Sequence, residues 1–265
     1  MQTKFEDLQG KWALILGASS GFGAATARAL AAAGMNICGV HLDRKAGMDA
    51  VDKLKADLTA AGAEILFFNI NASDEDKRNE VLATLKEGGH KVHTLFHSLA
   101  FGTLKPFIGE EKDTIGPKQM DMTLDVMAHS LVYWTQSVVR NHLFEKGGRV
   151  FAMTSAGSSK VWNTYGAVSA AKSALESHIR QLSLELAPHQ IAANAICAGV
   201  TDTPALRKIP GNEHMIEIAQ KKNPYARLTT PEDIAKATVA LCLPHMAWMT
   251  GNTLNIDGGE IIVDG

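Results

Sequence analysis

The chain has 265 residues, a formal net charge of -2 at pH 7, 46% hydrophobic residues and 20% charged residues. This length fits one large α/β domain or two small ones, and the composition argues against a disordered chain. The near-neutral charge gives no reason to expect a nucleic acid or an anionic membrane as a partner, and no apolar stretch reaches the about 20 residues that a membrane span needs.

Several other protein classes are disfavoured by the residue pattern. The N-terminal segment 1–12 is polar and lacks the apolar core of a signal peptide, so a cytoplasmic location is expected. Cys38, Cys197 and Cys242 lie far apart in apolar runs, which predicts buried thiols rather than a disulfide. The histidines at 90, 93 and 97 have no carboxylate near them in the sequence, so no metal site is expected.

Short apolar runs alternate with longer helical patterns along the whole chain. The first run, WALILG at 12–17, is apolar throughout and ends in glycine, as expected for a strand covered on both faces. The other predicted strands are 36–42, 64–70, 91–98, 149–155, 191–197 and 252–256. The predicted helices are 24–33, 45–61, 74–86, 120–144, 165–187 and 232–243.

This alternation predicts a parallel sheet, because right-handed crossovers through helices join parallel strands. We expect an α/β fold with one domain over residues 1–265. It should be a Rossmann-type, doubly wound parallel sheet of about seven strands with helices on both faces. A polar, proline-punctuated segment, 202–231, interrupts the alternation before the last helix.

A glycine-rich loop, GASSGFG, joins the first strand to the first helix. Gly17 allows the tight turn, Gly21 lets the backbone approach a pyrophosphate, and Gly23 permits close packing of helix on strand. The helix N-terminus then offers N–H donors to the phosphates. A dinucleotide is therefore the expected cofactor. The loop residues expected to bind it are Gly17, Ser19, Ser20, Gly21, Phe22 and Gly23.

The choice between NADH and NADPH is expected at the end of the second strand. A carboxylate there accepts the ribose 2′-OH, whereas a cation attracts a 2′-phosphate. His41 stands where a carboxylate often falls, and Asp43 is followed by Arg44 and Lys45. The two cations favour NADPH over NADH, although Asp43 could still reach the ribose and the glycine loop carries no basic residue.

The loop spacing, G-x-x-x-G-x-G, resembles that of the short-chain dehydrogenase/reductase family. The glycine-rich segment 250–259 near the C-terminus is similar to a motif common at that point in the family. The resemblance implies that Asn71 contacts adenine, in place of the usual aspartate. It also implies further cofactor contacts from Ala72, Ser98, Leu99, Ala100, Gly199, Thr201 and Thr203.

The segment 153–176 carries the residues of chemical interest. Members of this family place a serine on the fifth strand and a Tyr-x-x-x-Lys pair on the next helix. Ser155 and Lys172 match those positions, but Val168 stands where the tyrosine belongs, and the tyrosine is Tyr165. Residues 165, 168 and 172 share one helix face, so the tyrosine has moved about 4.5 Å along the axis without leaving that face.

This displacement changes the expected reaction. In a ketone reductase the phenol must reach the oxygen on the carbon that receives hydride. A phenol one turn away suits a conjugated enoyl thioester, in which hydride goes to C3 and negative charge develops on the thioester oxygen. Tyr165 would then donate a hydrogen bond or proton to that oxygen, Lys172 would bind the ribose hydroxyls, and Ser155 would position the thioester or a water.

The Tyr-x6-Lys spacing resembles the enoyl-acyl-carrier-protein reductases of fatty-acid synthesis, over essentially the whole chain. HSLAFG at 97–102 is similar to that group's motif and implies a substrate contact from Gly102. Two departures, the ordinary glycine loop and Ser155 in place of a second tyrosine, resemble a variant branch of the group. The resemblance implies NAD(P)H, an enoyl substrate linked to acyl carrier protein or coenzyme A, and a homotetramer.

The segment 203–227 falls where this family places its mobile substrate-covering loop. Its apolar residues, including Leu206, are expected to cover an acyl chain, and its five cations outnumber two glutamates. That excess could steer an acidic carrier protein, or the segment could be an ordinary amphipathic surface helix. Two other functions stay open: a carbonyl reductase of the 3-oxoacyl or hydroxysteroid type, and a dinucleotide-sensing protein without turnover.

Overall fold

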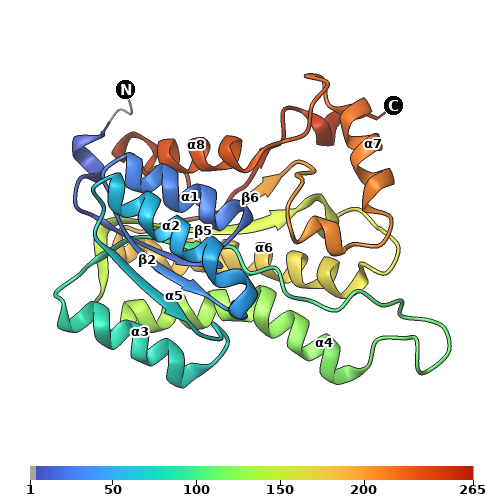
Figure 1. Ribbon diagram of the computed structural model, residues 1–265, viewed down its shortest axis with the longest axis horizontal. Helices are drawn as coiled ribbons and strands as arrows, with labels where there is room; N and C mark the ends of the chain where they lie inside the picture. Colours follow the sequence, from blue (N-terminus) through green and yellow to red (C-terminus); the bar gives the residue numbers. More distant parts are fainter. Residues whose placement is uncertain (1–3, 265) are drawn as a thin grey trace.

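The computed structural model describes residues 4–264 as an α/β sandwich (Figure 1). The strands are β1 Trp12–Leu16, β2 Asn36–His41, β3 Ile65–Asn69, β4 Val92–His97, β5 Phe144–Ser155, β6 Ala192–Ala198 and β7 Thr253–Ile256. The helices are α1 Gly21–Ala32, α2 Met48–Ala60, α3 Glu75–Glu87, α4 Pro117–Leu124, α5 Ser130–Arg140, α6 Gly166–Leu186, α7 Asn212–Lys222 and α8 Pro231–Cys242.

The seven strands form one parallel sheet in the order β3-β2-β1-β4-β5-β6-β7, which confirms the predicted Rossmann-type fold. The chain leaves β1 toward β2 on one side and later returns to place β4 on the other side. Leu16 lies opposite Val40 on β2 and His97 on β4, so these three strands end at one level. Ligands of open α/β sheets bind outside the carboxyl ends of the strands at such a reversal of order.

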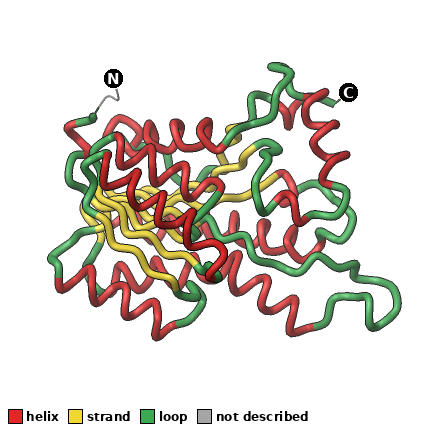
Figure 2. Tube along the Cα trace, viewed as in Figure 1, coloured by secondary structure: helices red, strands yellow, loops and turns green. Residues whose placement is uncertain are grey.

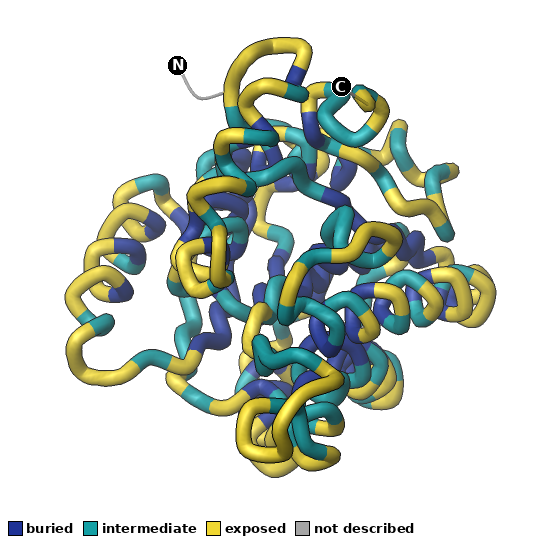
Figure 3. Tube along the Cα trace, turned by 90° about the vertical axis from the view of Figure 1, so that its right-hand side faces the viewer, coloured by how far each residue is buried: buried dark blue, intermediate teal, exposed yellow. Residues whose placement is uncertain are grey.

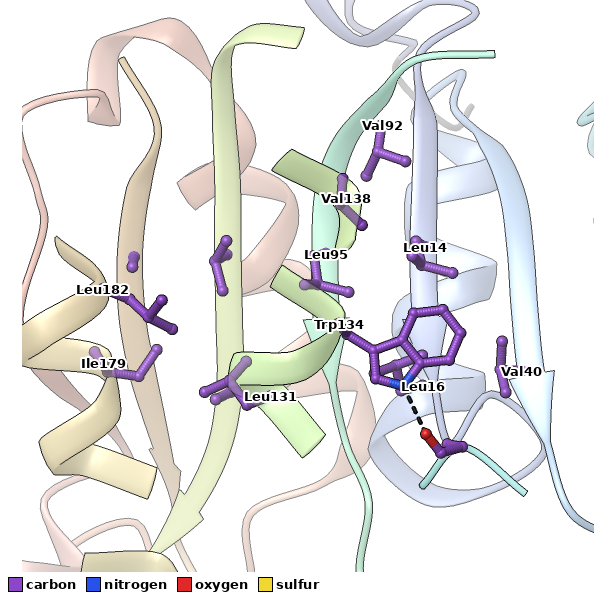
Figure 4. Packing of buried hydrophobic residues seen from close by; sticks show 14 of the residues in the cluster. Leu14, Leu16, Val40, Val92, Leu95, Leu131, Trp134, Val138, Ile179 and Leu182 are labelled. Atoms are coloured by element: carbon purple, nitrogen blue, oxygen red, sulfur yellow. Dashed lines mark hydrogen bonds between the residues drawn. The ribbon is translucent and has the colours of Figure 1, made fainter. Parts of the chain in front are cut away.

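Two layers of helices cover the sheet, as the coloured trace in Figure 2 shows. One apolar cluster joins the sheet to α3, α5 and α6, and the other joins it to α1, α2 and α8. In the first, the Trp134 ring is fully buried and its Nε1 donates to the Ala72 carbonyl oxygen at 2.8 Å (Figure 4). Replacing a buried tryptophan by alanine typically costs about 3–5 kcal/mol of stability.

Several predicted boundaries are wrong. The helix predicted over 120–144 is three elements: α4, a π-helical turn over Asp125–His129, and α5. Phe144 already belongs to β5, because His142 adopts a left-handed conformation with φ 55 and ends the helical run. The first helix begins at Gly21 rather than at 24, directly after the extended residue Ser20. The proline-punctuated segment also contains a helix of its own, α7.

Cys38, Cys197 and Cys242 are buried free thiols, as predicted. Among residues 4–264, no helix is both long and apolar enough to cross a membrane. The same part of the chain holds no group of three or more His, Cys, Asp or Glu side chains arranged to bind a metal ion.

Candidate active site

The predicted site residues gather at the carboxyl end of the sheet. Six strands contribute, because each ends at this edge: β1 before the glycine loop, β2 at His41, β3 at Asn69, β4 at His97, β5 at Ser155 and β6 at Ala198. Figure 3 views this end of the molecule and shows exposed and half-buried loops around it. The carboxyl edge is therefore where the chain can place a cofactor and a substrate side by side.

The glycine loop has the geometry that the sequence predicted. Gly17 is left-handed, with φ 85, and a Cβ there would lie 2.5 Å from the Ser98 carbonyl oxygen. A Cβ on Gly23 would lie only 2.0 Å from the Gly17 carbonyl oxygen, so no side chain fits between helix and loop. Gly21 is also left-handed, and a Cβ there would lie 3.6 Å from Thr203 Cγ2. A side chain at Gly17 or Gly23 would therefore clash with neighbouring backbone, so both positions require glycine.

The first turn of α1 fits an anionic ligand. Ser20 precedes the helix in extended conformation and its side chain makes no cap hydrogen bond, and the first turn carries no acidic residue. The first N–H groups of a helix have no partner within the helix, and they carry the positive end of its dipole. A pyrophosphate is the group that such an uncapped helix N-terminus after a glycine loop accommodates.

The end of β2 presents both a carboxylate and two cations. Asp43 Oδ2 lies 2.9 Å from Nδ1 of the buried His41, and the Asp43 amide donates to Asn69 Oδ1 at 3.0 Å. Arg44 and Lys45 are exposed, and neither takes part in an ion pair among residues 4–264. Asp43 is therefore held by its own neighbours, whereas the two cations remain available to a phosphate.

Asn71, which was predicted to contact adenine, and the loop residues after β4 also lie at the carboxyl edge of the sheet. Asn71 is exposed and its Oδ1 accepts from the Ser73 amide at 3.1 Å, so its adenine contact stays a prediction. Ser98 is tied to β1 by its amide, which donates to the Leu16 carbonyl oxygen at 2.9 Å. Leu99 packs against the core beside Gly17, and Ala100 is exposed.

Lys172 is buried against β5. Only 6% of the residue is exposed, and its Nζ donates to the Met153 carbonyl oxygen at 2.6 Å. Burial lowers the pKa of Lys172 to about 8, while the charges of Glu176 and Cys197 oppose this shift. The ammonium therefore loses its proton more readily than an exposed lysine does.

Tyr165 lies beside Ser155 at the end of β5. A Cβ on Gly157 would meet Tyr165 Cε1 at 2.5 Å and Ser155 Oγ at 3.2 Å, so both side chains border the same glycine. Burial raises the pKa of the Tyr165 phenol. Ser155 Oγ is buried and has no hydrogen-bond partner among the residues described. The pair thus offers a protonated phenol and a free hydroxyl to an oxygen atom.

Val168 fills the place where a Tyr-x-x-x-Lys helix would carry its phenol. It is buried, and its Cγ2 lies 3.0 Å from where a Cβ on Gly102 would be. The same Cβ would lie 2.8 Å from Thr123 Cγ2 and 2.9 Å from Met127 Sδ. These three neighbours carry no phenol, and the tyrosine instead stands at the N-cap of α6 as Tyr165.

The segment after β6 returns to the glycine loop. Thr201 Oγ1 donates to the Gly199 carbonyl oxygen at 2.9 Å, and Thr203 Oγ1 accepts from the Leu206 amide at 3.2 Å. Both threonines and Leu206 are buried. A Cβ on Gly21 would lie 3.6 Å from Thr203 Cγ2, so Thr203 borders the glycine loop, and its contact with a pyrophosphate stays a prediction.

The cation excess of the covering segment 203–227 is smaller than its sequence suggests. Arg207 forms a two-pronged ion pair with Asp202, at 2.7 and 2.9 Å. Arg227 pairs in the same way with Asp233, at 2.6 and 3.1 Å. Both carboxylates lie outside the stretch over which the charges were counted, so two of its five cations are already neutralised.

Two residues near the site were not predicted from the sequence. Glu176 follows Lys172 by one helical turn and accepts a hydrogen bond from Thr154 Oγ1 at 2.6 Å. Trp162 donates from its indole N–H to the Pro210 carbonyl oxygen at 3.1 Å. The four-residue spacing from Lys172 was a signal for Glu176. Nothing in the sequence pointed from Trp162 to Pro210.

Comparisons with known proteins indicate the family of this chain. A family model described as enoyl-(acyl carrier protein) reductase matches residues 17–260. The chain is 30% identical to enoyl-acyl-carrier-protein reductase (NADH) FabI of Aquifex aeolicus (strain VF5) over 191 residues, 72% of this chain and 69% of that protein. It is 26% identical to 3-oxoacyl-acyl-carrier-protein reductase of Synechocystis sp. over 255 residues, 94% of this chain and 96% of that one.

A solved structure shows the same fold. The crystal structure of enoyl-acyl-carrier-protein reductase (NADH) from Aquifex aeolicus VF5 superposes with a TM-score of 0.85 and 25% sequence identity. The match covers 97% of this chain and 99% of that chain.

Proposed function

This chain belongs to the short-chain dehydrogenase/reductase family and is an NAD(P)-dependent oxidoreductase, and we propose that it reduces the C2=C3 bond of enoyl thioesters. The observation that carries the proposal is the position of Tyr165, one helical turn before Val168 and beside Ser155. The acyl group would be linked to an acyl carrier protein or coenzyme A, as in fatty-acid synthesis.

The proposed roles follow from where charge develops. The bound dinucleotide supplies the hydride that C3 accepts. Tyr165, whose raised pKa keeps it protonated, donates a hydrogen bond or its proton to the enolate oxygen that forms on the thioester. Ser155 offers the same oxygen a second donor. Lys172 binds the ribose hydroxyls and favours negative charge nearby.

An apolar surface beside Tyr165 supports an acyl substrate. The Phe107 ring packs on Gly166, where a Cβ would lie 2.4 Å from its Cζ. Phe101, Ile108 and Val161 are exposed on the loop after β4 and on the turn before α6. Exposed apolar side chains on loops beside a site are typical of a surface that binds an apolar ligand.

We propose NADPH rather than NADH as the preferred cofactor. The Asp43 carboxylate is engaged by His41, whereas Arg44 and Lys45 are exposed and outside the ion pairs described. A 2′-phosphate would form charge-assisted hydrogen bonds with such cations. The carboxylate nevertheless lies close enough to oppose them, so both cofactors need to be assayed.

The deciding experiment compares a crotonyl thioester with an acetoacetyl thioester, each with NADH and with NADPH. Our proposal requires a kcat/KM for the crotonyl thioester at least about tenfold above that for the acetoacetyl thioester. Faster reduction of the ketone would refute it. Dinucleotide binding without turnover of either substrate would instead indicate a sensing protein.

Carbonyl reduction is the second candidate function, and Ser155 is the observation that favours it. A serine at the end of β5, beside a tyrosine, is the donor pair that a ketone oxygen needs. The 3-oxoacyl reductase of Synechocystis sp. is matched over more of this chain than the Aquifex aeolicus protein is. The position of Tyr165 argues against carbonyl reduction, because Val168 stands where a Tyr-x-x-x-Lys helix would carry its tyrosine.

A further inference from the structure

Within the covering segment 203–227, residues 206–222 are held to the body of the protein by few side chains. Of residues 206–222, only Leu206 and Ala219 are buried. Among the residues described, one hydrogen bond joins 208–222 to the chain outside 203–227. Trp162 Nε1 donates it to the Pro210 carbonyl oxygen at 3.1 Å. The Trp162 ring also lies 6.3 Å from the His214 ring and 3.6 Å from where a Cβ on Gly211 would be.

The same tryptophan is bonded to Tyr165 through its backbone. The Tyr165 amide donates to the Trp162 carbonyl oxygen at 3.2 Å, which closes a four-residue turn immediately before α6. Trp162 thus binds the covering segment with its side chain and the proposed proton donor with its main chain. No other residue described makes both contacts.

The turn between them is strained. Thr164 has φ 62, in the left-handed region that turns usually fill with glycine or asparagine, and a β-branched residue is a real outlier there. Its Oγ1 is buried without a hydrogen-bond partner among residues 4–264. Strained conformations of this kind persist where surrounding structure fixes them, and they occur often beside active sites.

We propose that Trp162 is a positioning residue that couples closure of the covering segment to the placement of the Tyr165 phenol. When the segment lies over the substrate, the bond to Pro210 fixes Trp162, and the rigid turn through Thr164 then fixes Tyr165. The inference rests on the proposed role of Tyr165 as hydrogen-bond donor, and it holds for an enoyl or a carbonyl substrate.

The test uses Trp162→Phe, which keeps an aromatic ring against Gly211 and removes the N–H donor. Hydrogen exchange of the 208–222 amides and of the Tyr165 amide should accelerate together. kcat should fall about three- to tenfold while the Kd of the dinucleotide stays unchanged. Trp248→Phe is the matched control, because Trp248 is 97% exposed on the loop before β7, and it should change none of these quantities.

Faster exchange at 208–222 with unchanged exchange at Tyr165 would overturn the coupling. So would coupled exchange with an unchanged kcat. If the wild type reduces no thioester, the proposed function fails, but the two exchange measurements still decide whether the segments are coupled.

Thr164→Gly provides a second variant that does not touch the covering segment. It should raise the unfolding temperature by relieving strain, yet lower kcat about three- to tenfold because the turn becomes flexible. KM should change less than kcat. A more stable variant with full kcat would contradict the proposed role of the turn.

Discussion

The Thr154 hydroxyl donates a hydrogen bond of 2.6 Å to the Glu176 carboxylate, which lies one helical turn beyond Lys172. This contact joins the end of β5 to α6 and fixes a negative charge beneath a buried ammonium. The charges of Glu176 and Cys197 both raise the pKa of Lys172 against the effect of burial. Burial lowers the pKa of His97 to about 3, and the Lys172 charge adds to this shift. The Glu176 carboxylate therefore helps to keep Lys172 protonated.

We first predict a shift in the pH profile of Glu176→Gln. The pKa of Lys172 is about 8, so activity that needs the ammonium is present below that pH and is lost as the pH rises through it. Removing the Glu176 charge should move this alkaline limb about one unit lower, as measured by kcat against pH. Glu185→Gln, on an exposed part of α6, is the control. An unmoved limb in Glu176→Gln would remove Glu176 from the site.

Tyr165→Phe should separate chemistry from binding. The variant keeps the ring that packs beside Gly157 and loses the donor to the enolate oxygen. Loss of one such donor typically lowers kcat about 10²- to 10³-fold. Single-turnover kinetics with a crotonyl thioester measure the effect, and fluorescence titration should give an unchanged dinucleotide Kd. Full turnover in this variant would assign the proton donor to another group.

Gly23→Ala should damage the cofactor site through the backbone alone. The new Cβ would lie 2.0 Å from the Gly17 carbonyl oxygen, so α1 must move away from the loop. We expect at least about tenfold weaker dinucleotide binding, with an overpacking cost of about 1–3 kcal/mol in unfolding free energy. Gly116→Ala is the control, since nothing lies within 4 Å of its Cβ position. Equal cofactor affinity in both variants would argue against the predicted phosphate site.

The cofactor preference gives a charge-specific prediction. Arg44→Ser should raise KM for NADPH about tenfold and leave KM for NADH nearly unchanged, because only NADPH carries the 2′-phosphate. Lys53→Ser, which removes an exposed cation from α2, should alter neither value. If Arg44→Ser weakens both cofactors equally, the residue supports the fold of the loop rather than the choice of cofactor.

If an acyl carrier protein docks on the covering segment, its binding should depend on the lysines there that form no ion pair. Lys208 and Lys221 are exposed and outside the ion pairs described, whereas Arg207 and Arg227 are paired. Reversing both lysines to glutamate should raise KM for a carrier-linked enoyl substrate severalfold more than KM for the coenzyme A thioester. Lys86→Glu on α3 is the control. Equal effects on both thioesters would refute the docking surface.

The local sequence determined the strand and helix order, the glycine loop and the Tyr-x6-Lys spacing. These features were predictable because they depend on residues close together in the chain: a continuous apolar run makes a buried strand, and a left-handed position favours glycine. The unusual spacing of Tyr165 and Lys172 needed only helix periodicity to be understood.

Tertiary packing decided the remaining features. The π-helical turn at Asp125–His129 precedes Ser130. The Ser130 hydroxyl donates a hydrogen bond to the Val126 carbonyl oxygen, and it also lies 2.8 Å from Nε2 of His97 on β4. Glu176 meets Thr154 across 22 residues, and Trp162 meets Pro210 across 48. Such contacts are specific to one packed arrangement, because they depend on how elements dock rather than on the pattern within any one of them.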